Sequence, residues 1–306
     1  MIAPGRVVEA GTLVIRDGLI VAAGAQVEIP PDARVEDLAG KTLYPGLIDA
    51  YAERPWPENA PPAQGGNPND QVHPEREIAP YAYDEGWVLQ HRNAGITTAL
   101  IAPEDGVLRG SSALIAMGDG GTGANLLRRR AAQHVSLAQI PRRTTYPTST
   151  MGTVALFRQT VLDARWYDQA REIWRQHPQQ QRVAYDASLE ALAGDLRGGV
   201  RFVFKTADPN GAARAARLAR ELDVPAMLMG NGREYQCLAQ LRKAALPVIV
   251  PLDFPKPPKV GDEGEAREIG LAELRHWDHA PANPAEALGA GLTVALTSFG
   301  LEVPGD

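Results

Sequence analysis

Four side chains with reactive groups stand at the ends of predicted strands or in the loops beside them: Tyr51, Glu53, His73 and Lys205. Tyr51 and Glu53 lie two positions apart at the end of the apolar run 43–51. Side chains alternate along a strand, so these two are expected to point the same way. We regard the four residues as candidate catalytic groups.

Lys205 is the second-last residue of the run RFVFKT, a predicted strand over residues 201–206. At a strand end, burial can lower the pKa of a lysine enough for Schiff-base or general-base chemistry. The alternative is an ion pair with Asp208, or with Glu53, that compensates charge and has no chemical role. The sequence leaves both interpretations open.

Two other motifs favour ordinary structural explanations. His276 and His279 are spaced as a possible surface metal clamp, but a short histidine pair without a third buried ligand is more typical of a solvated helix end. Residues 118–123 match G-x-G-x-x-G. The arginines at 128–130 follow them, and we expect a glycine turn between strands rather than a dinucleotide site.

The composition is that of an ordinary globular chain. The 306 residues are 44% hydrophobic, enough for a barrel-sized core, and the net charge of -6 argues against a nucleic-acid partner. Cys237 is the single cysteine, so no intrachain disulfide can form. No apolar run reaches the length of about 18 residues that spans a membrane. We expect a cytoplasmic protein, or an exported one if a signal peptide precedes this segment.

From residue 43 onward, apolar β runs alternate with helical stretches, which is typical of repeated β-α units. Strands are predicted at 43–51, 97–102, 113–117, 133–137, 201–206, 226–230, 247–252 and 293–298. Helices are predicted at 83–94, 151–176, 185–193, 210–222, 233–245, 265–277 and 284–290. Eight such strands fit an α/β fold, a (β/α)8 TIM-type barrel whose working face is at the carboxyl ends of the strands.

Three segments fall outside a minimal barrel. Residues 7–24 predict a hairpin turning at Asp17-Gly18, so 1–42 are expected to form a small, incomplete β-sandwich domain ahead of the barrel at 43–306. Residues 54–80 are rich in proline, glycine and asparagine and predict an excursion over the barrel mouth, which would bring His73 near the opening. Residues 104–150 predict a second insertion.

The run KTLYPGLIDA at 41–50, together with the hairpin, resembles the amidohydrolase superfamily. Residues 67–76, 110–115 and 151–160 are similar to a bacterial branch near the imidazolonepropionase group, in which a barrel with degraded metal ligands can precede a complete one. The resemblance implies a metal-dependent hydrolase fold, zinc or another divalent metal, and hydrolysis of carbon-nitrogen bonds other than peptide bonds.

The positions that the resemblance assigns to metal ligands carry other residues. Tyr51 and Glu53 stand in place of the His-x-His pair. The other replacements are Lys205 and Thr206 on the fifth strand, Gly230 and Asn231 on the sixth, and Ser298 in place of the eighth-strand aspartate. Gln133 and His134 lie on the fourth strand, where no bridging group is recognised. The expectation is therefore a site without a metal cofactor, in a pocket lined by Tyr51, Glu53, Thr206, Asn231 and Ser298.

Three functions remain open, because a fold does not decide function. The chain could be a pseudoenzyme that serves as a structural or binding barrel beside a second amidohydrolase domain or in a homo-oligomer. It could be a metal-independent hydrolase. It could bind a small anionic metabolite in the old pocket through arginine and lysine. The truncated appearance of the small domain predicts either a fragment of a longer protein or completion of an exposed sheet edge by association.

Overall fold

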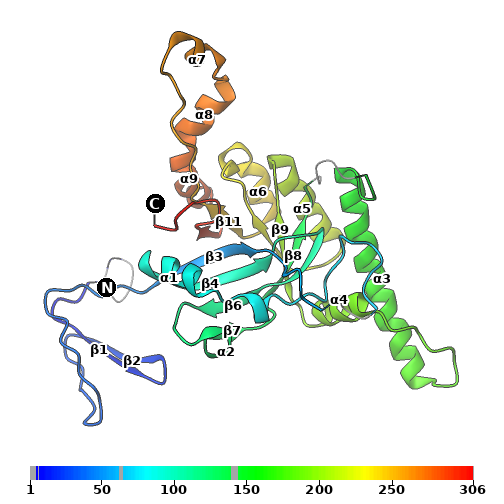
Figure 1. Cartoon of the computed structure of the whole chain (residues 1–306), viewed down its shortest axis with the longest axis horizontal. Coiled ribbons are helices and arrows are strands. Elements are labelled where there is room, and N and C mark those ends of the chain that lie inside the picture. Colours follow the sequence, from blue (N-terminus) through cyan, green and yellow to red (C-terminus); the bar gives the residue numbers. More distant parts are fainter. Residues whose placement is uncertain (1–4, 6, 62–64, 139–143, 306) are drawn as a thin grey trace. The chain divides into compact units, whose positions relative to one another are not determined.

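The computed structural model describes residues 5, 7–61, 65–138 and 144–305 (Figure 1). Residues 1–4, 6, 62–64 and 139–143, which belong to the predicted segments 1–42, 54–80 and 104–150, lie outside the described residues. The chain forms two compact units, one extending to Leu47 and the other beginning at Ile48. Among the described helices, none combines the length and the apolar character that spanning a membrane requires.

The N-terminal unit contains one β-hairpin. Strands β1 (Thr12–Arg16) and β2 (Leu19–Gly24) pair antiparallel around Asp17 and Gly18, whose φ angles are 52° and 76°. Positive φ at both turn residues matches the right-handed twist of the strands, which confirms the predicted hairpin. The predicted β-sandwich is not observed: a sandwich needs a second sheet, and the described residues of this unit form a sheet of two strands.

The larger unit is built around a six-stranded sheet. Its strands lie in the order β12 (Val294–Thr297), β11 (Val248–Pro251), β10 (Ala226–Met229), β9 (Arg201–Lys205), β8 (Ala132–Ser136) and β5 (Leu108–Ser111). The five strands from β8 to β12 are parallel, and β5 pairs antiparallel with β8. Neighbouring parallel strands need long crossover connections, and the predicted helices lie in these connections.

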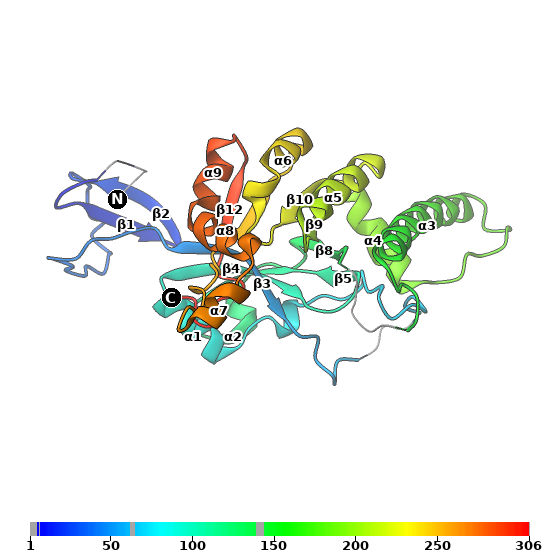
Figure 2. The same cartoon turned by 90° about the horizontal axis from the view of Figure 1, so that it is seen from above.

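Helices cover one face of this sheet. They are α3 (Thr150–Gln176), α4 (Ala187–Arg197), α5 (Pro209–Glu221), α6 (Leu238–Ala244) and α9 (Asn283–Gly289). Figure 2 shows them following one another along the sheet. Phe202 and Phe204 of β9 pack among residues of these helices, including Phe157 of α3. Burying a phenylalanine side chain contributes about 1.5–3 kcal/mol, so this layer is a main source of stability.

A second sheet has four strands, in the order β3 (Leu47–Arg54), β4 (Ile96–Pro103), β6 (Ala113–Ala116) and β7 (Leu126–Arg128). Helix α1 (Glu85–Asn93) lies between β3 and β4 in the chain. The carboxylate of Asp84 accepts a bond from the Trp87 amide at 2.8 Å and so caps the start of α1. The remaining elements are η1 (Ala79–Tyr81), α2 (Gly121–Asn125), η2 (Glu234–Gln236), α7 (Glu263–Glu268), α8 (Leu271–His279) and η3 (Ala280–Ala282).

The eight predicted strands are all present, but the strand pairing of the described residues does not show a closed barrel. They divide between the two sheets, and the segment 104–150 adds the antiparallel strands β5 and β7. A closed barrel requires each strand to be paired on both sides. Side chains link β12 to β3, since the Thr297 hydroxyl donates to the Tyr51 carbonyl. The mixed α/β class is therefore confirmed, and the predicted closed (β/α)8 topology is not shown.

The face of the six-stranded sheet away from these helices meets β3 in a second apolar layer. Tyr51, Ala132, Val203, Met229 and Ile249 belong to this layer. Because alternate residues of a strand share a face, Lys205 lies on the same side of β9 as Val203, and Glu53 on the same side of β3 as Tyr51. The strand pattern thus brings Glu53 and Lys205 to one end of this layer.

Candidate functional site

The carboxylate of Glu53 is held by two cations. Lys205 Nζ donates to Oε1 at 2.9 Å and to Oε2 at 2.8 Å, and Arg109 Nη1 donates to Oε1. The Tyr51 hydroxyl also donates to Glu53 Oε1. We call Glu53, Arg109 and Lys205 the Glu53 ion cluster. The pairing of Lys205 with Glu53 that the sequence suggested is confirmed as a contact.

The alternative partner of Lys205 is engaged elsewhere. Asp208 accepts a bond from the Gly211 amide at 2.7 Å and caps helix α5. Its carboxylate also pairs with Arg214 at 3.1 Å. Asp208 is therefore a helix cap rather than the counter-ion of Lys205.

Arg109 was not among the residues that the sequence singled out. It belongs to β5, which was not predicted as a strand, and only 9% of its side chain is exposed. Its Nη1 also lies 3.3 Å from the Tyr51 hydroxyl, and its Nε donates to the Gly106 carbonyl at 3.3 Å. The available signal was one arginine inside the otherwise uncharged run VLRGSSALIA.

The surroundings of the cluster decide its protonation. Burial alone would raise the pKa of Glu53, but Arg109, Lys205 and Tyr51 together lower it below the usual value. Burial raises the pKa of Tyr51 well above its usual value, and Arg109 offsets part of this effect. Glu53 is thus a carboxylate and a weak base, whereas Tyr51 keeps its proton.

His134 lies against the ring of Tyr51, with ring centres 5.6 Å apart. It is fully buried, and neither ring nitrogen has a hydrogen-bond partner among the described residues. Burial, together with the nearby charge of Arg109, lowers the pKa of His134 to about 3. The imidazole is therefore neutral.

The donors at this place do not fit a divalent metal ion. The Glu53 oxygens bind Arg109 and Lys205, Tyr51 is protonated, and His134 supplies a single imidazole. Zinc sites in proteins use three or four protein ligands. Within residues 5, 7–61, 65–138 and 144–305, no group of three or more histidine, cysteine, aspartate or glutamate side chains could hold a metal ion.

A cavity of about 200 Å³ adjoins the cluster. Tyr51, Glu53 and Ser298, three of the predicted pocket residues, line it together with Trp87 and Phe299. Ser298 donates its hydroxyl proton to Asp49 Oδ2 at 2.5 Å. Lys205 Nζ lies 4.4 Å from the ring centre of Phe299, which lines this cavity.

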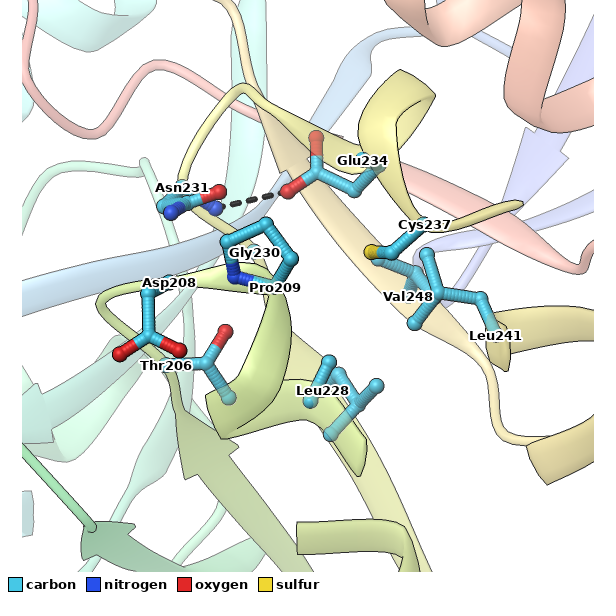
Figure 3. Close-up of a pocket in the computed structure, with 11 residues that line it drawn as sticks. Thr206, Asp208, Pro209, Leu228, Gly230, Asn231, Glu234, Cys237, Leu241 and Val248 are labelled. Atoms are coloured by element: carbon cyan, nitrogen blue, oxygen red, sulfur yellow. Dashed lines mark hydrogen bonds between the residues drawn. The ribbon is translucent and has the colours of Figure 1, made fainter. Parts of the chain in front are cut away.

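The other two predicted pocket residues, Thr206 and Asn231, line a separate pocket of about 10 Å³ (Figure 3). That volume holds about one water molecule. The buried carboxylate of Glu234 accepts the Asn231 amide at 2.7 Å and the Asn283 side chain at 2.6 Å, which braces the loop after β10. Burial, with Glu234 nearby, raises the pKa of the Cys237 thiol to about 11, so this cysteine is protonated.

The remaining candidate histidines make contacts outside the cluster. His73 Nε2 donates to the Asp70 carbonyl at 2.8 Å, and its Nδ1 lies 3.7 Å from Glu75. His276 and His279 both stack on Tyr235, with ring centres 6.1 and 5.2 Å away. The stacked geometry agrees with the structural interpretation of the histidine pair.

Known proteins resemble this chain in structure rather than in sequence. The sequence matches no protein-family model and no curated protein. A crystal structure of an amidohydrolase from Thermotoga maritima MSB8 superposes with a TM-score of 0.73 at 18% identity, over 95% of this chain and 75% of that one. This chain has an amidohydrolase fold. A second solved amidohydrolase, at 14% identity, gives a TM-score of 0.42, too low to support an argument.

The likeness to an amidohydrolase corrects one expectation. The sequence led us to expect no cofactor. The solved amidohydrolase with a similar structure suggests a metal cofactor, so the expectation of no cofactor is wrong. The side chains that do not fit a divalent metal ion are only those around Glu53.

Proposed function

We propose that this amidohydrolase-fold chain is a binding domain whose Glu53 ion cluster holds a small anion. The observation that carries the proposal is one buried carboxylate placed between two cations. With Glu53 ionised, the cluster has a formal charge of +1. Charges interact more strongly at such a site than in water, so an anionic ligand would complete the charge balance.

The cations also retain hydrogen-bond donors. A lysine ammonium has three N–H groups, and two of them are used by the two Glu53 oxygens. The hydrogen bonds of Arg109 to described residues run through Nε and Nη1. Lys205 is the more accessible cation, with 28% of its side chain exposed. A ligand carboxylate could bind Lys205 first while Arg109 strengthens the local field.

The alternative of a metal-independent hydrolase finds less support at this cluster. Such an enzyme needs a base to activate water, and the lowered pKa makes Glu53 a poor one. The purely structural alternative, a barrel beside a second amidohydrolase domain or in a homo-oligomer, predicts no ligand response at all. Anion binding therefore separates the proposed function from the purely structural alternative.

The experiment is a thermal-shift and calorimetric titration of the purified chain with small carboxylates and inorganic phosphate. Wild type should be stabilised in a saturable way, and Lys205→Ala should weaken that response. Glu53→Gln should strengthen it, because the substitution removes the internal carboxylate that competes for both cations. Lys243→Ala, an exposed lysine on α6, is the matched control and should behave as wild type.

Two results would overturn the proposal. One is anion stabilisation of equal size in wild type, Lys205→Ala and Glu53→Gln. The other is stoichiometric metal in the purified chain that is lost in Glu53→Gln, since the carboxylate would then be a metal ligand.

A further inference from the structure

The cavity of about 200 Å³ beside the cluster is lined by groups that accept hydrogen bonds. It lies between the end of β3, helix α1 and the segment 298–304. Its lining contains two acidic side chains, Glu53 and Glu302, and among the described lining residues none is a lysine or an arginine. Glu53 is already paired with Arg109 and Lys205, so the acidic charge of this lining comes mainly from Glu302.

His91 presents a hydrogen-bond acceptor whose tautomer follows from its contacts. Its Nδ1 lies 2.8 Å from the Trp87 carbonyl oxygen, which can only accept, so Nδ1 carries the proton. Burial lowers the pKa of His91, which keeps the ring neutral. The Nε2 atom then has a lone pair, because the hydrogen bond of the ring to Trp87 runs through Nδ1.

Two further wall residues accept hydrogen bonds. Ser298 gives its hydroxyl proton to Asp49, so its remaining capacity is that of an acceptor. Glu302 is an exposed carboxylate at the rim, 3.2 Å from Lys256. A ligand that satisfies these groups must carry several N–H donors.

The aromatic walls of this cavity already face cations of the chain itself. Lys205 Nζ lies 4.4 Å above the Phe299 ring centre, and the Arg54 guanidinium lies 5.4 Å from that of Trp87. The cavity is smaller than the roughly 300–1,000 Å³ of pockets for drug-sized ligands. Its occupant is therefore a small molecule.

We propose that this cavity binds a small primary ammonium group, with His91, Ser298 and Glu302 accepting its N–H bonds and the rings of Trp87 and Phe299 packing against its carbon atoms. This site is separate from the anion site. Because Lys205 lies over Phe299, the two adjoin, and a zwitterion could occupy both. That extension alone rests on the proposed function.

The test is NMR and thermal-shift titration of the whole chain with ethylammonium chloride, sodium propionate and β-alanine at one ionic strength. Ethylammonium should bind saturably, and His91→Leu should abolish the response. Glu302→Gln should weaken it about two- to fivefold, the range for an exposed charge pair. Lys256→Gln should strengthen it, because Glu302 then loses its competing partner. Glu273→Gln on α8 is the matched acidic control and should match wild type.

The two sites can fail independently. Propionate binding that depends on Lys205, without any ethylammonium response, would overturn the cation site and leave the anion site intact. Ethylammonium binding that is the same in wild type, Glu302→Gln and Lys256→Gln would also overturn it, even if His91→Leu fails to fold. Loss of the propionate response alone would count against the anion site only.

Discussion

Lys205 Nζ lies 2.8 Å from Glu53 Oε2, although 152 positions separate the two residues in the sequence. The contact joins the ends of β3 and β9, which belong to different sheets. Arg109 reaches the same carboxylate from β5. One carboxylate thus links three strands of the larger unit, and the following predictions depend on this arrangement and on its surroundings.

Removing Arg109 should destabilise the chain. Arg109→Ala leaves Glu53 buried with one counter-ion, and breaking a buried pair by removing one partner costs about 3–5 kcal/mol. The double variant Arg109→Ala with Glu53→Gln should lose less than the sum of the two single losses. Urea unfolding of wild type, the two single variants and the double variant measures this coupling. Strictly additive losses would show that the two side chains do not interact in solution.

Acid should weaken the chain partly through Glu53. The folded-state pKa of Glu53 lies below the usual 4.5, so its contribution is fully present above that pH and is lost as the pH falls through the folded value. Urea unfolding between pH 6 and 3 should therefore show a smaller acid loss for Glu53→Gln than for wild type. Because Glu75 and Glu77 also have lowered pKa values, part of the loss should remain in the variant. An unchanged pH dependence would contradict this assignment.

Replacing His134 with leucine should stabilise the chain by about 1–3 kcal/mol, because it removes a buried polar ring without partners. The variant should also be less sensitive to acid. The pKa of His134 is about 3 when folded and about 6.5 when unfolded, so wild-type stability falls as the pH drops below 6.5. Chemical unfolding at several pH values checks both effects. His177→Leu, at the exposed end of α3, is a control without the gain.

Gly110→Ala should destabilise the chain and weaken anion binding. Gly110 has a φ of 108°, and an added Cβ would lie 2.5 Å from the Arg76 carbonyl oxygen. That contact would displace β5 and with it Arg109. Gly194→Ala in helix α4, where an added Cβ meets nothing within 4 Å, should instead stabilise by about 0.5–1 kcal/mol. Thermal unfolding and the propionate titration distinguish the two variants, and equal behaviour would contradict the steric argument.

Much of the local structure could be read from the sequence. The Asp17-Gly18 turn, the eight strands and the long helices follow from turn chemistry and from hydrophobic periods that act over a few residues. The period of two along β3 placed Tyr51 and Glu53 on one face. The apolar run before Lys205 placed this lysine at the end of β9. These features are local, so no distant residue is needed to specify them.

The tertiary structure decided the rest. The division of the strands into two sheets, the arrival of Arg109 beside Glu53 and the burial of His134 without partners depend on contacts between segments far apart in the chain. A local pattern carries little information on which strand edges meet, or on which face of a short strand such as β5 becomes buried. The charge balance around Glu53, and therefore the chemistry open to it, arises only when β3, β5 and β9 come together.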